Sequence, residues 1–378
     1  MILPGATLGI LGGGQLGRMT ALAARELGYG VVVMDPDPEC AARGVVDRVV
    51  VGDFGDAGAA TMLARVADVV TYEIEKIGPS ALDAVRTTTP LRPGPDVLAV
   101  VQDRLTQKEW LAAHGFPVAP FRAADSPAAL AAAARALGSC RAKSRRGGYD
   151  GRGQYRVGRI DDALDAEAGR AWQGVGGAPC VVEAELDLEA ELSVMVARTP
   201  SGAVALFPPA RNWHVDGILD VSVLPGDLPA AAAARALEHT RAMAGAFALE
   251  GLLAVEWFVT RDGSVYVNEL APRPHNTFHT TRLACATSQF EQLVRAVCGL
   301  PLGDAEAVRP VALANLLGDL WRDGAPALAD ALALPGVQLH LYGKAPRPGR
   351  KVGHLLATGT TAADALAMVK EARRRIAG

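Results

Sequence analysis

Hydrophobic and polar positions alternate in a strand–helix–strand pattern at the start of the chain. Residues 6–11 form a short apolar run, a glycine-rich turn and an amphipathic helix follow, and residues 31–34 form a second apolar run. Strand, helix and strand joined by short turns are typical of a βαβ unit with a parallel sheet. Further apolar runs at 45–51 and 67–71 add strands. The pattern therefore predicts a doubly wound, Rossmann-like domain.

The pattern changes after a boundary rich in proline and glycine at residues 90–95. A helix is predicted from about Pro95 to His114, and residues 118–186 alternate short strands and helices as a small α+β unit. The rest of the chain carries longer apolar runs that suit an antiparallel sheet with helices packed on it. These changes predict three domains, at residues 1–103, 104–186 and 187–378.

Composition narrows the expected partners and location. A net charge of -3 over 378 residues offers no general basic surface for nucleic acid or an anionic membrane. No stretch approaches the roughly 18 apolar residues of a membrane helix, and the N-terminus lacks the charged start of a secretory signal. The five cysteines are odd in number and lack CxxC spacing, which argues against a disulfide scaffold or a zinc site. We therefore expect a cytoplasmic protein.

The first glycine-rich turn allows three interpretations. Gly12, Gly14 and Gly17 form a GxGxxG pattern between strand and helix, and Asp35 ends the next strand. This spacing is typical of a dinucleotide site in which the acid binds a ribose. Any phosphate would suit the turn equally, because glycines let the backbone approach an anion and a helix N-terminus offers free N–H groups. A tight turn without a ligand is the third interpretation.

A predicted β-hairpin places two glutamates opposite each other. The Asp-Gly pair at residues 262–263 is a strong signal for a two-residue turn between apolar strands. With those residues as the turn, Val259 faces Tyr266 and Glu256 faces Glu269. Residues directly opposite in an antiparallel pair have Cβ atoms about 4.5–5.5 Å apart. The two carboxylates are therefore predicted to be close neighbours.

Two carboxylates this close repel each other unless a cation compensates them. Oxygen ligands without nearby Cys or paired His suit Mg²⁺, which usually binds substrate phosphates as well. Glu256 and Glu269 are therefore predicted metal ligands. The apolar neighbours on both strands disfavour the alternative, in which both glutamates face solvent. Asn268 should point to the opposite face, so it joins the ligands only if the strand bends there.

Two further segments suit a nucleotide. Residues 143–154 join four glycines to four cations, so backbone N–H groups and side chains could close over a polyphosphate. Lys143 ends a strand and is held rigidly, which suits a fixed contact to phosphate oxygens. Residues 181–186 form an apolar strand that runs into acids. Its backbone could bind adenine and a following acid the ribose, although a solvated loop and a solvated acidic turn are the alternatives.

These segments, in this order, resemble the ATP-grasp superfamily, and over residues 7 to about 355 the chain is similar to 5-(carboxyamino)imidazole ribonucleotide synthetases. The strings that carry the resemblance are Gly12–Met19, Thr71–Glu75, Gly147–Gln154, Asn268–Asn276, Ala286–Gln292 and Gly349–His354. The resemblance implies an ATP-grasp fold of α/β and α+β type. Its parts would be an N-terminal Rossmann-like pre-ATP-grasp domain, a small lid domain and a C-terminal antiparallel-sheet domain that carries the metal and substrate-phosphate sites.

The resemblance also implies a reaction. ATP, bicarbonate and 5-aminoimidazole ribonucleotide would give ADP, phosphate and the N-carboxylated nucleotide, through carboxyphosphate, in purine biosynthesis. Mg²⁺ and cations would stabilise the charge on the transferring phosphoryl group. ATP and Mg²⁺ are the implied cofactors, and no biotin is needed. The family further implies a cytoplasmic homodimer that binds neither nucleic acid nor membrane.

The family's functional positions can be carried over one by one. Those that would bind ATP are Arg104, Lys143, Gly148, Gly151, Gly153, Glu183, Ala184, Glu185, Leu186, Glu191 and Asn268. Those that would line the chemical centre are Tyr149, Asp150, Arg273, His275 and Asn276. The acceptor nucleotide would meet Gln15, Leu16, Glu73 or Glu75, and its phosphate would meet Lys344, Arg350 and Lys351. Glu256 and Glu269 would hold the metal.

One departure and three alternative functions stay open. Phe278 stands where the family pattern has a glycine, which puts the neighbouring turn and the role of His279 in question. The first alternative is a formate-dependent ATP-grasp ligase that formylates glycinamide ribonucleotide. The second is an NAD-dependent oxidoreductase, which would rest only on the first glycine loop. The third is a nucleotide-binding protein without catalysis, although every expected cation and carboxylate is present.

Overall fold

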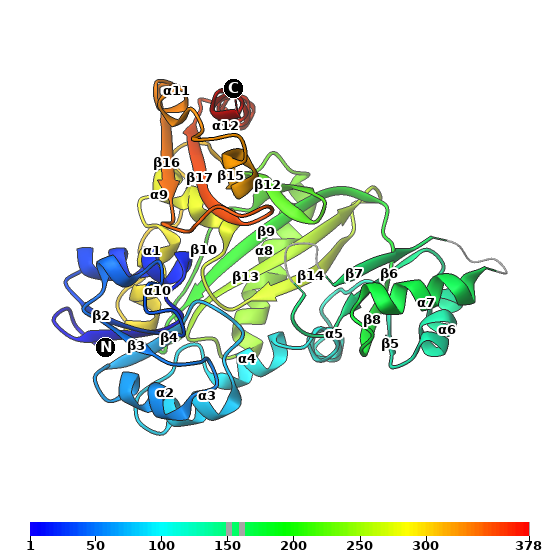
Figure 1. The fold of residues 1–378 in the computed structure, drawn as a ribbon, viewed down its shortest axis with the longest axis horizontal. Coiled ribbons are helices and arrows are strands. Elements are labelled where there is room, and N and C mark those ends of the chain that lie inside the picture. Colours follow the sequence, from blue (N-terminus) through cyan, green and yellow to red (C-terminus); the bar gives the residue numbers. More distant parts are fainter. Residues whose placement is uncertain (149–152, 159–162, 378) are drawn as a thin grey trace.

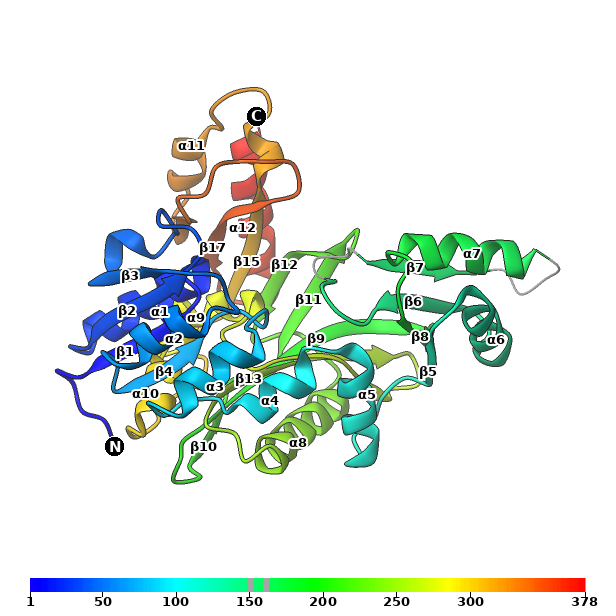
Figure 2. The same ribbon diagram turned by 60° about the horizontal axis from the view of Figure 1, so that its bottom comes forward.

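The computed structural model describes residues 1–148, 153–158 and 163–377, and these residues form three β-sheets (Figures 1 and 2). The first sheet is parallel, in the order β3-β2-β1-β4, which confirms the predicted α/β start. Its strands are β1 (Thr7–Leu11), β2 (Gly30–Asp35), β3 (Arg48–Val51) and β4 (Val69–Tyr72). The helices beside it are α1 (Gln15–Glu26), α2 (Ala57–Ala64) and α3 (Pro79–Arg86), with the short 3₁₀ helix η1 (Arg43–Val45).

Strand β2 shows why the strands of the first sheet are apolar at every position. Val31 and Val33 point into a core shared with the large C-terminal sheet, whereas Val32 and Met34 point to the core under α2 and α3. A parallel strand covered on both faces needs apolar residues at every position. The N-terminal sheet is therefore packed directly against the rest of the molecule.

The helix predicted from Pro95 to His114 is two helices, α4 (Pro95–Val101) and α5 (Arg104–Ala113). The backbone is extended at Asp103 (φ -132°, ψ 118°). The Asp103 carboxylate caps α5 by accepting hydrogen bonds from Leu105 N and Thr106 N. The prediction was wrong because an aspartate inside an apolar periodicity can end one helix and begin the next when it finds the following N–H groups.

The second sheet is small and antiparallel, in the order β5-β8-β6-β7, and it forms the lid that projects at the right of Figure 1. Its strands are β5 (Phe121–Ala124), β6 (Cys140–Ser144), β7 (Gln154–Val157) and β8 (Cys180–Ala184). Helices α6 (Pro127–Leu137) and α7 (Leu164–Gly174) supply the alanines that fill its core.

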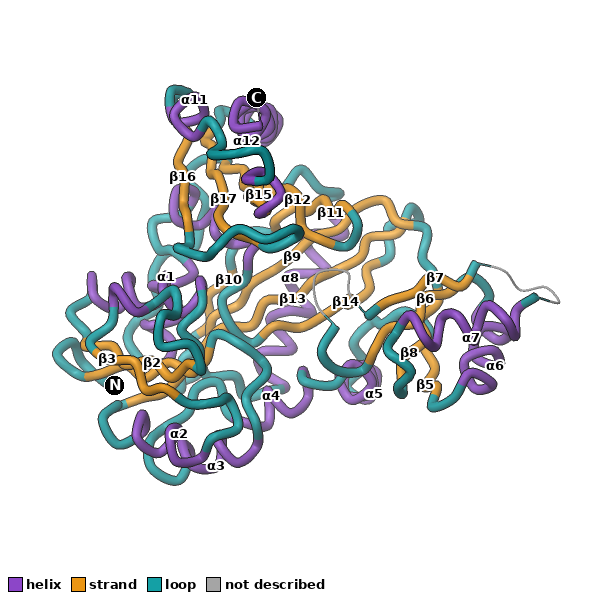
Figure 3. Tube along the Cα trace, viewed as in Figure 1, coloured by secondary structure: helices purple, strands orange, loops and turns teal. Residues whose placement is uncertain are grey.

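The third sheet is the largest and carries the predicted metal hairpin, with its strands in the order β14-β13-β9-β11-β12-β15-β17-β16 and β10 paired to β9 (Figure 3). The strands are β9 (Leu188–Arg198), β10 (Val204–Leu206), β11 (Ala210–Val215), β12 (Ile218–Leu224), β13 (Gly251–Thr260), β14 (Val265–Ala271), β15 (Val311–Leu317), β16 (Val337–Leu341) and β17 (Lys351–Thr358). The helices are α8 (Ala230–Ala246), α9 (Thr281–Ala284), α10 (Gln289–Cys298), α11 (Leu328–Leu332) and α12 (Ala362–Ala377), with η2 (Asn276–Thr280) and η3 (Gly318–Trp321). Within the described ranges, no helix is long and apolar enough to cross a membrane.

The hairpin of β13 and β14 pairs Glu256 with Glu269, as predicted, although the register between them differs. Phe258, not Val259, faces Tyr266. The turn contains three residues because Gly263 takes a left-handed conformation (φ 82°), which suits a type I turn followed by a bulge. A second irregularity next to Glu256 leaves Asn268 unpaired and restores the register.

Candidate functional site

Two adjoining cavities lie where the three sheets meet. The first, of about 810 Å³, is lined by lid residues and by the metal hairpin. The second, of about 1020 Å³, is lined by the first glycine loop and by the loop before β17. Arg273, His275 and Asn276 line both cavities. The described members of the predicted chemical centre therefore lie at the boundary between the two cavities.

A buried ion cluster joins the lid to the large sheet. Lys143 Nζ lies 3.0 Å from Glu183 Oε2 and 3.3 Å from Asn268 Oδ1. Lys108 Nζ lies 3.4 Å from the same Glu183 oxygen and donates to Val267 O at 3.0 Å. Burial alone would raise the pKa of Glu183, but the two lysines outweigh burial and lower its pKa to about 2. Burial lowers the pKa of Lys108 to about 8.

Lys108 was not predicted as a site residue. It lies one helical turn after Arg104 on α5, so the i to i+4 spacing places both cations on the same face of the helix. That spacing is the signal that could have found it. Its side chain is 1% exposed, and no charge pattern in the sequence indicates which carboxylate it meets.

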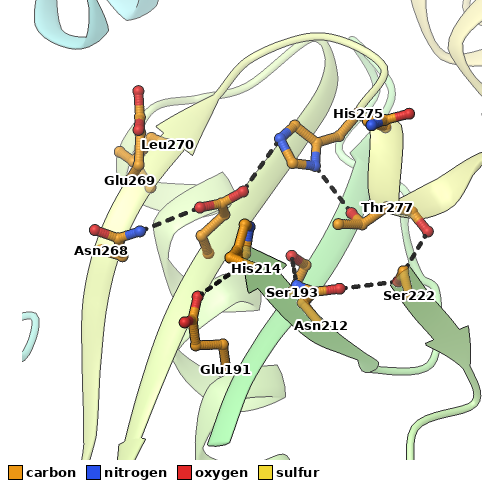
Figure 4. A network of polar contacts seen from close by, with 12 residues as sticks. Glu191, Ser193, Asn212, His214, Ser222, Asn268, Glu269, Leu270, His275 and Thr277 are labelled. Carbon is orange, nitrogen blue, oxygen red and sulfur yellow. Dashed lines mark hydrogen bonds and ion pairs between the residues drawn. The ribbon is translucent and has the colours of Figure 1, made fainter. Parts of the chain in front are cut away.

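The predicted metal hairpin, formed by β13 and β14, carries polar side chains that contact neighbouring residues (Figure 4). Asn268 Nδ2 donates to Glu256 Oε2 at 3.1 Å, and His275 Nε2 lies 3.3 Å from Glu256 Oε1. Arg104 Nη2 lies 3.2 Å from Glu269 Oε2. Because the strand bends at Asn268, this amide joins the glutamates, which strict alternation would have prevented. Burial, with the charge of Glu269 adding to it, raises the pKa of Glu256.

Two carboxylates and an amide oxygen fit a hard cation held together with phosphate oxygens. Within residues 1–148, 153–158 and 163–377, no group of three His, Cys, Asp or Glu side chains could hold a metal alone. The donor set therefore suits Mg²⁺ completed by substrate phosphates better than a structural metal site.

Two histidines flank the hairpin in opposite charge environments (Figure 4). Burial and the charge of Arg273 lower the pKa of His275 well below its usual value, and its Nδ1 lies 2.9 Å from Thr277 Oγ1. His214 Nδ1 lies 2.8 Å from Glu191 Oε2, and this contact raises the pKa of His214 despite its burial. His214 lies in the first cavity because β11 is irregular between Trp213 and His214.

The first glycine loop binds a carboxylate of the protein itself. Gly14 N and Gly17 N donate to the two oxygens of Glu73 at 2.7 and 2.9 Å. Gly13 N donates to Asp35 Oδ2 at 2.8 Å, so the expected ribose-binding acid is also engaged. The anion expected at this helix N-terminus is therefore internal. The dinucleotide interpretation is wrong, because Glu73 fills the place of a pyrophosphate.

The second cavity carries the remaining predicted substrate residues. Lys344 Nζ donates to Gln15 Oε1 at 2.6 Å, and Arg273 Nη2 lies 2.7 Å from Glu75 Oε1. The other predicted members on its wall are Leu16, Glu73, Arg350 and Lys351. Arg347 also lines this cavity and was not predicted. Buried Arg273 Nε and Asn276 Oδ1 have no hydrogen-bond partner within the described structure, as expected of groups that meet a ligand or water.

The lid residues divide between the cavities. The predicted ATP-binding residues Lys143, Gly153, Glu183–Leu186 and Glu191 line the first cavity, whereas Gly148 lines the second. Ala184 N and Glu185 N donate to Pro120 O and Ser139 O, so these two amides are unavailable as donors to adenine. Tyr149, Asp150 and Gly151 lie outside the described residues.

The departure at Phe278 leaves the site intact. Its side chain is fully buried in the core, with its ring centroid 6.1 Å from that of Phe207. His279 is also fully buried and stacks on His354 at 4.4 Å, so it belongs to the packing behind the site. A bulky residue fits here because η2 turns it away from the cavities.

The lid, the paired glutamates and the junction of two cavities define an ATP-grasp enzyme. The ATP-grasp domain model matches residues 109–290. The ribonucleotide synthetase preATP-grasp domain matches residues 5–102, and the phosphoribosylaminoimidazole carboxylase C-terminal domain matches residues 311–368.

The relatives give the particular family. The N5-carboxyaminoimidazole ribonucleotide synthase of Brucella melitensis biotype 1 is 42% identical over 354 residues, which cover 93% of this chain and 96% of the relative. The same enzyme of Bacillus subtilis is 38% identical and covers 94% and 92%. The chain belongs to the N5-carboxyaminoimidazole ribonucleotide synthase family of ATP-grasp ligases, which confirms the resemblance.

Solved structures agree with this family. An ADP complex of an N5-carboxyaminoimidazole ribonucleotide synthetase has a TM-score of 0.92 at 39% identity and covers 99% of this chain and 97% of its own. The Aspergillus clavatus enzyme in complex with ADP and 5-aminoimidazole ribonucleotide has a TM-score of 0.90 at 31% identity and covers 98% of both chains.

Lys108→Met should destabilise the protein by about 1–3 kcal/mol at pH 7, because the buried Glu183 carboxylate and Val267 O each lose a polar partner. The folded-state pKa of Glu183 lies below the unfolded value of 4.5, at about 2, so its ionised form stabilises the fold above pH 4.5 and this contribution is lost as the pH falls towards 2. Thermal unfolding of wild type and variant across this range should therefore show a difference that narrows in acid. Lys370→Met, at an exposed position of α12, is the matched control. An equal loss at every pH would contradict the ion-cluster explanation.

Proposed function

We propose that this ATP-grasp ligase carboxylates 5-aminoimidazole ribonucleotide with bicarbonate, using ATP, and so produces N5-carboxyaminoimidazole ribonucleotide, ADP and phosphate for purine biosynthesis. The observation that carries this proposal is the shared wall of Arg273, His275 and Asn276. A group activated in one cavity can be transferred there to an acceptor in the other without passing through bulk water.

ATP would occupy the first cavity. Lys143 and Arg104 would contact its phosphates, and Glu191 would bind the ribose. Backbone groups of residues 183–186 other than the amides of Ala184 and Glu185 would bind adenine. Two observations support this placement. Lys143 reaches the hairpin at Asn268 Oδ1 and Arg104 reaches it at Glu269 Oε2, and His214 Nδ1 lies 2.8 Å from the Glu191 carboxylate.

Mg²⁺ would be held by Glu256 and Glu269, with Asn268 beside them. When bound, it supplies positive charge for the phosphates and for the transferring phosphoryl group. The pKa of Glu256 is raised mainly by burial and also by Glu269, which is the environment that a cation would relieve. Arg104 already offers one positive charge to Glu269 at 3.2 Å.

The acceptor nucleotide would occupy the second cavity. Its phosphate would bind near Lys344, Arg350 and Lys351, because Glu73 already fills the glycine loop and would repel a second anion there. Lys351 lines both cavities, so a phosphate bound there would lie next to the shared wall. Tyr149 and Asp150 would complete the chemical centre, as the family implies.

The chemical step would join the two cavities. Bicarbonate attacks the γ-phosphorus of ATP and forms carboxyphosphate as ADP leaves. The exocyclic amine then attacks the carboxyl carbon, a C–N bond forms, phosphate departs and the amine loses a proton. Burial and Arg273 lower the pKa of His275 well below its usual value, so its neutral imidazole is a weak base and would act here as a hydrogen-bonding group. Arg273 and Asn276 would orient the carboxylate.

We also propose that the protein acts as a homodimer in the cytoplasm. The family supports a dimer. All five cysteines are buried and free, which suits a reducing compartment.

ADP release should require the acceptor nucleotide. Purified protein with ATP, Mg²⁺, bicarbonate and 5-aminoimidazole ribonucleotide should release ADP, and labelled bicarbonate should enter the product. Without the acceptor, release should fall to background. ADP release that instead depends on formate and glycinamide ribonucleotide would overturn the assignment in favour of the formylating ligase. ATP binding without turnover under either condition would favour a binding protein.

Glu269→Gln should lower kcat/KM by at least about 100-fold, because one oxygen ligand for Mg²⁺ loses its charge. The variant should also need more Mg²⁺ for half-maximal activity, which a titration of turnover against Mg²⁺ would measure. Glu306→Gln, at an exposed position before β15, makes the same chemical change away from both cavities. An unchanged Mg²⁺ requirement in Glu269→Gln would show that this carboxylate is no ligand.

A further inference from the structure

The carboxylate of Asp103 serves two purposes at the junction of α4 and α5. Oδ1 accepts from Leu105 N at 3.0 Å and Thr106 N at 3.2 Å, which caps α5. Arg145 Nε lies 3.0 Å from both oxygens, Arg145 Nη2 lies 2.9 Å from Oδ2, and Arg146 Nε lies 3.2 Å from Oδ2. The Asp103 side chain is only 4% exposed.

The cap alone does not explain an aspartate at this position. Asn and Ser cap helices about as well as Asp does, because one oxygen acceptor is enough. Here the second oxygen and the negative charge face two guanidinium groups. Only a carboxylate can accept from the helix amides and from both arginines at once. The charge of Asp103 therefore serves the arginines, and its acceptor oxygen serves the helix.

These arginines begin the glycine-rich loop where it passes between the two cavities. Arg145, Arg146, Gly147 and Gly148 line the cavity of the acceptor, whereas Lys143, just before them on β6, lines the cavity of ATP. The backbone is tied at the same place, since Arg104 N donates to Arg145 O at 2.9 Å. The start of the loop is therefore fastened to the first turn of α5 by both backbone and side chains.

Helix α5 is fastened in turn to the metal hairpin. Lys108 Nζ donates to Val267 O at 3.0 Å, and Leu270 N donates to Gln107 Oε1 at 3.2 Å. Arg104 reaches Glu269 from the same helix. A continuous set of contacts thus runs from the loop start, through Asp103 and α5, to the two strands that carry the glutamates.

We infer that Asp103 is a positioning residue. Through Arg145 and Arg146 it holds residues 145–148 at the wall of the acceptor cavity, in a fixed place relative to Arg104 and the metal hairpin. This position couples ATP cleavage to the presence of the acceptor. This inference rests on the proposed carboxylation. Asp103 touches neither substrate and acts through the residues that it holds. Without it, the ATP cavity keeps its own lysines and glutamates, whereas the wall of the acceptor cavity loses its fixed position.

Asp103→Asn separates the two purposes. The amide oxygen keeps the helix cap, whereas the amide NH₂ donates and meets two arginines that also donate. We expect kcat/KM for 5-aminoimidazole ribonucleotide to fall at least about tenfold, with KM for ATP changed less than threefold and the thermal midpoint near that of wild type. Trypsin should cleave after Arg145 or Arg146 faster than in wild type. Asp103→Glu should restore part of the loss, because the charge is kept.

Asp56→Asn is the matched control, because Asp56 caps α2 through Gly58 N and Ala59 N and pairs with no arginine among the described residues. It should leave both kinetic constants unchanged. Arg145→Gln should reproduce the loss of kcat/KM for the acceptor. The double variant Asp103→Asn with Arg145→Gln should lose little more activity than either single variant, because both substitutions remove the same contact between Asp103 and Arg145.

Three results would overturn the inference. Wild-type acceptor kinetics and trypsin resistance in Asp103→Asn would show that the contact holds nothing. A fall in thermal midpoint that accounts for the whole activity loss would make Asp103 a helix cap only. Additive losses in the double variant would show that the two residues act separately. Failure of the proposed reaction is distinguishable, because wild type itself would then show no acceptor dependence, whereas the trypsin comparison needs no substrate.

Discussion

A carboxylate buried in the interior constrains the whole arrangement. Glu183 lies on a lid strand, yet its side chain points to the place where the lid meets the large sheet, so its charge must be compensated by protein groups. Lys143 from the neighbouring lid strand and Lys108 from α5 provide this compensation. The two lysines also contact β14, through Asn268 Oδ1 and Val267 O. One buried charge therefore links three separate parts of the chain at the edge of the first cavity.

The same principle governs the acceptor side. A helix N-terminus with glycines attracts an anion, and here the protein supplies that anion with Glu73. The cations Lys344, Arg350 and Lys351 line the same cavity and, under the proposed function, would bind the substrate phosphate in place of the glycine loop. The net charge of -3 gives no indication of these local groups of charges. Local charges therefore say more about the anion sites of this molecule than its net charge does.

The sequence could predict helices and strands, the order of the domains and the pairing of Glu256 with Glu269, because these features depend on local periodicity and on turn residues. The hairpin shows the limit. The turn is one residue longer than predicted, and the bulge at Asn268 takes up one residue further along the strand. The predicted pairing of the two glutamates was therefore right, although the predicted pairing of the residues between them and the turn was wrong. Tertiary contacts decided the rest. Nothing local indicates that Glu73 reaches the glycine loop or that Lys108 meets Glu183. The roles assigned to the site residues stay predictions.

The residues at the shared wall are held by contacts that use no substrate. Arg273 is paired with Glu75, His275 is fixed by Thr277 at its ring and by Gln289 Oε1 at its backbone N–H, and Asn276 donates to Asn315. A side chain fixed in this way needs no reorganisation when the reacting groups arrive. Within the described part of the chain, Arg273 Nε and Asn276 Oδ1 have no hydrogen-bond partner and are therefore available to a ligand. The polar atoms from Arg273 to Asn276 thus divide between two tasks: some hold the wall in place, and these two are left to meet whatever binds there.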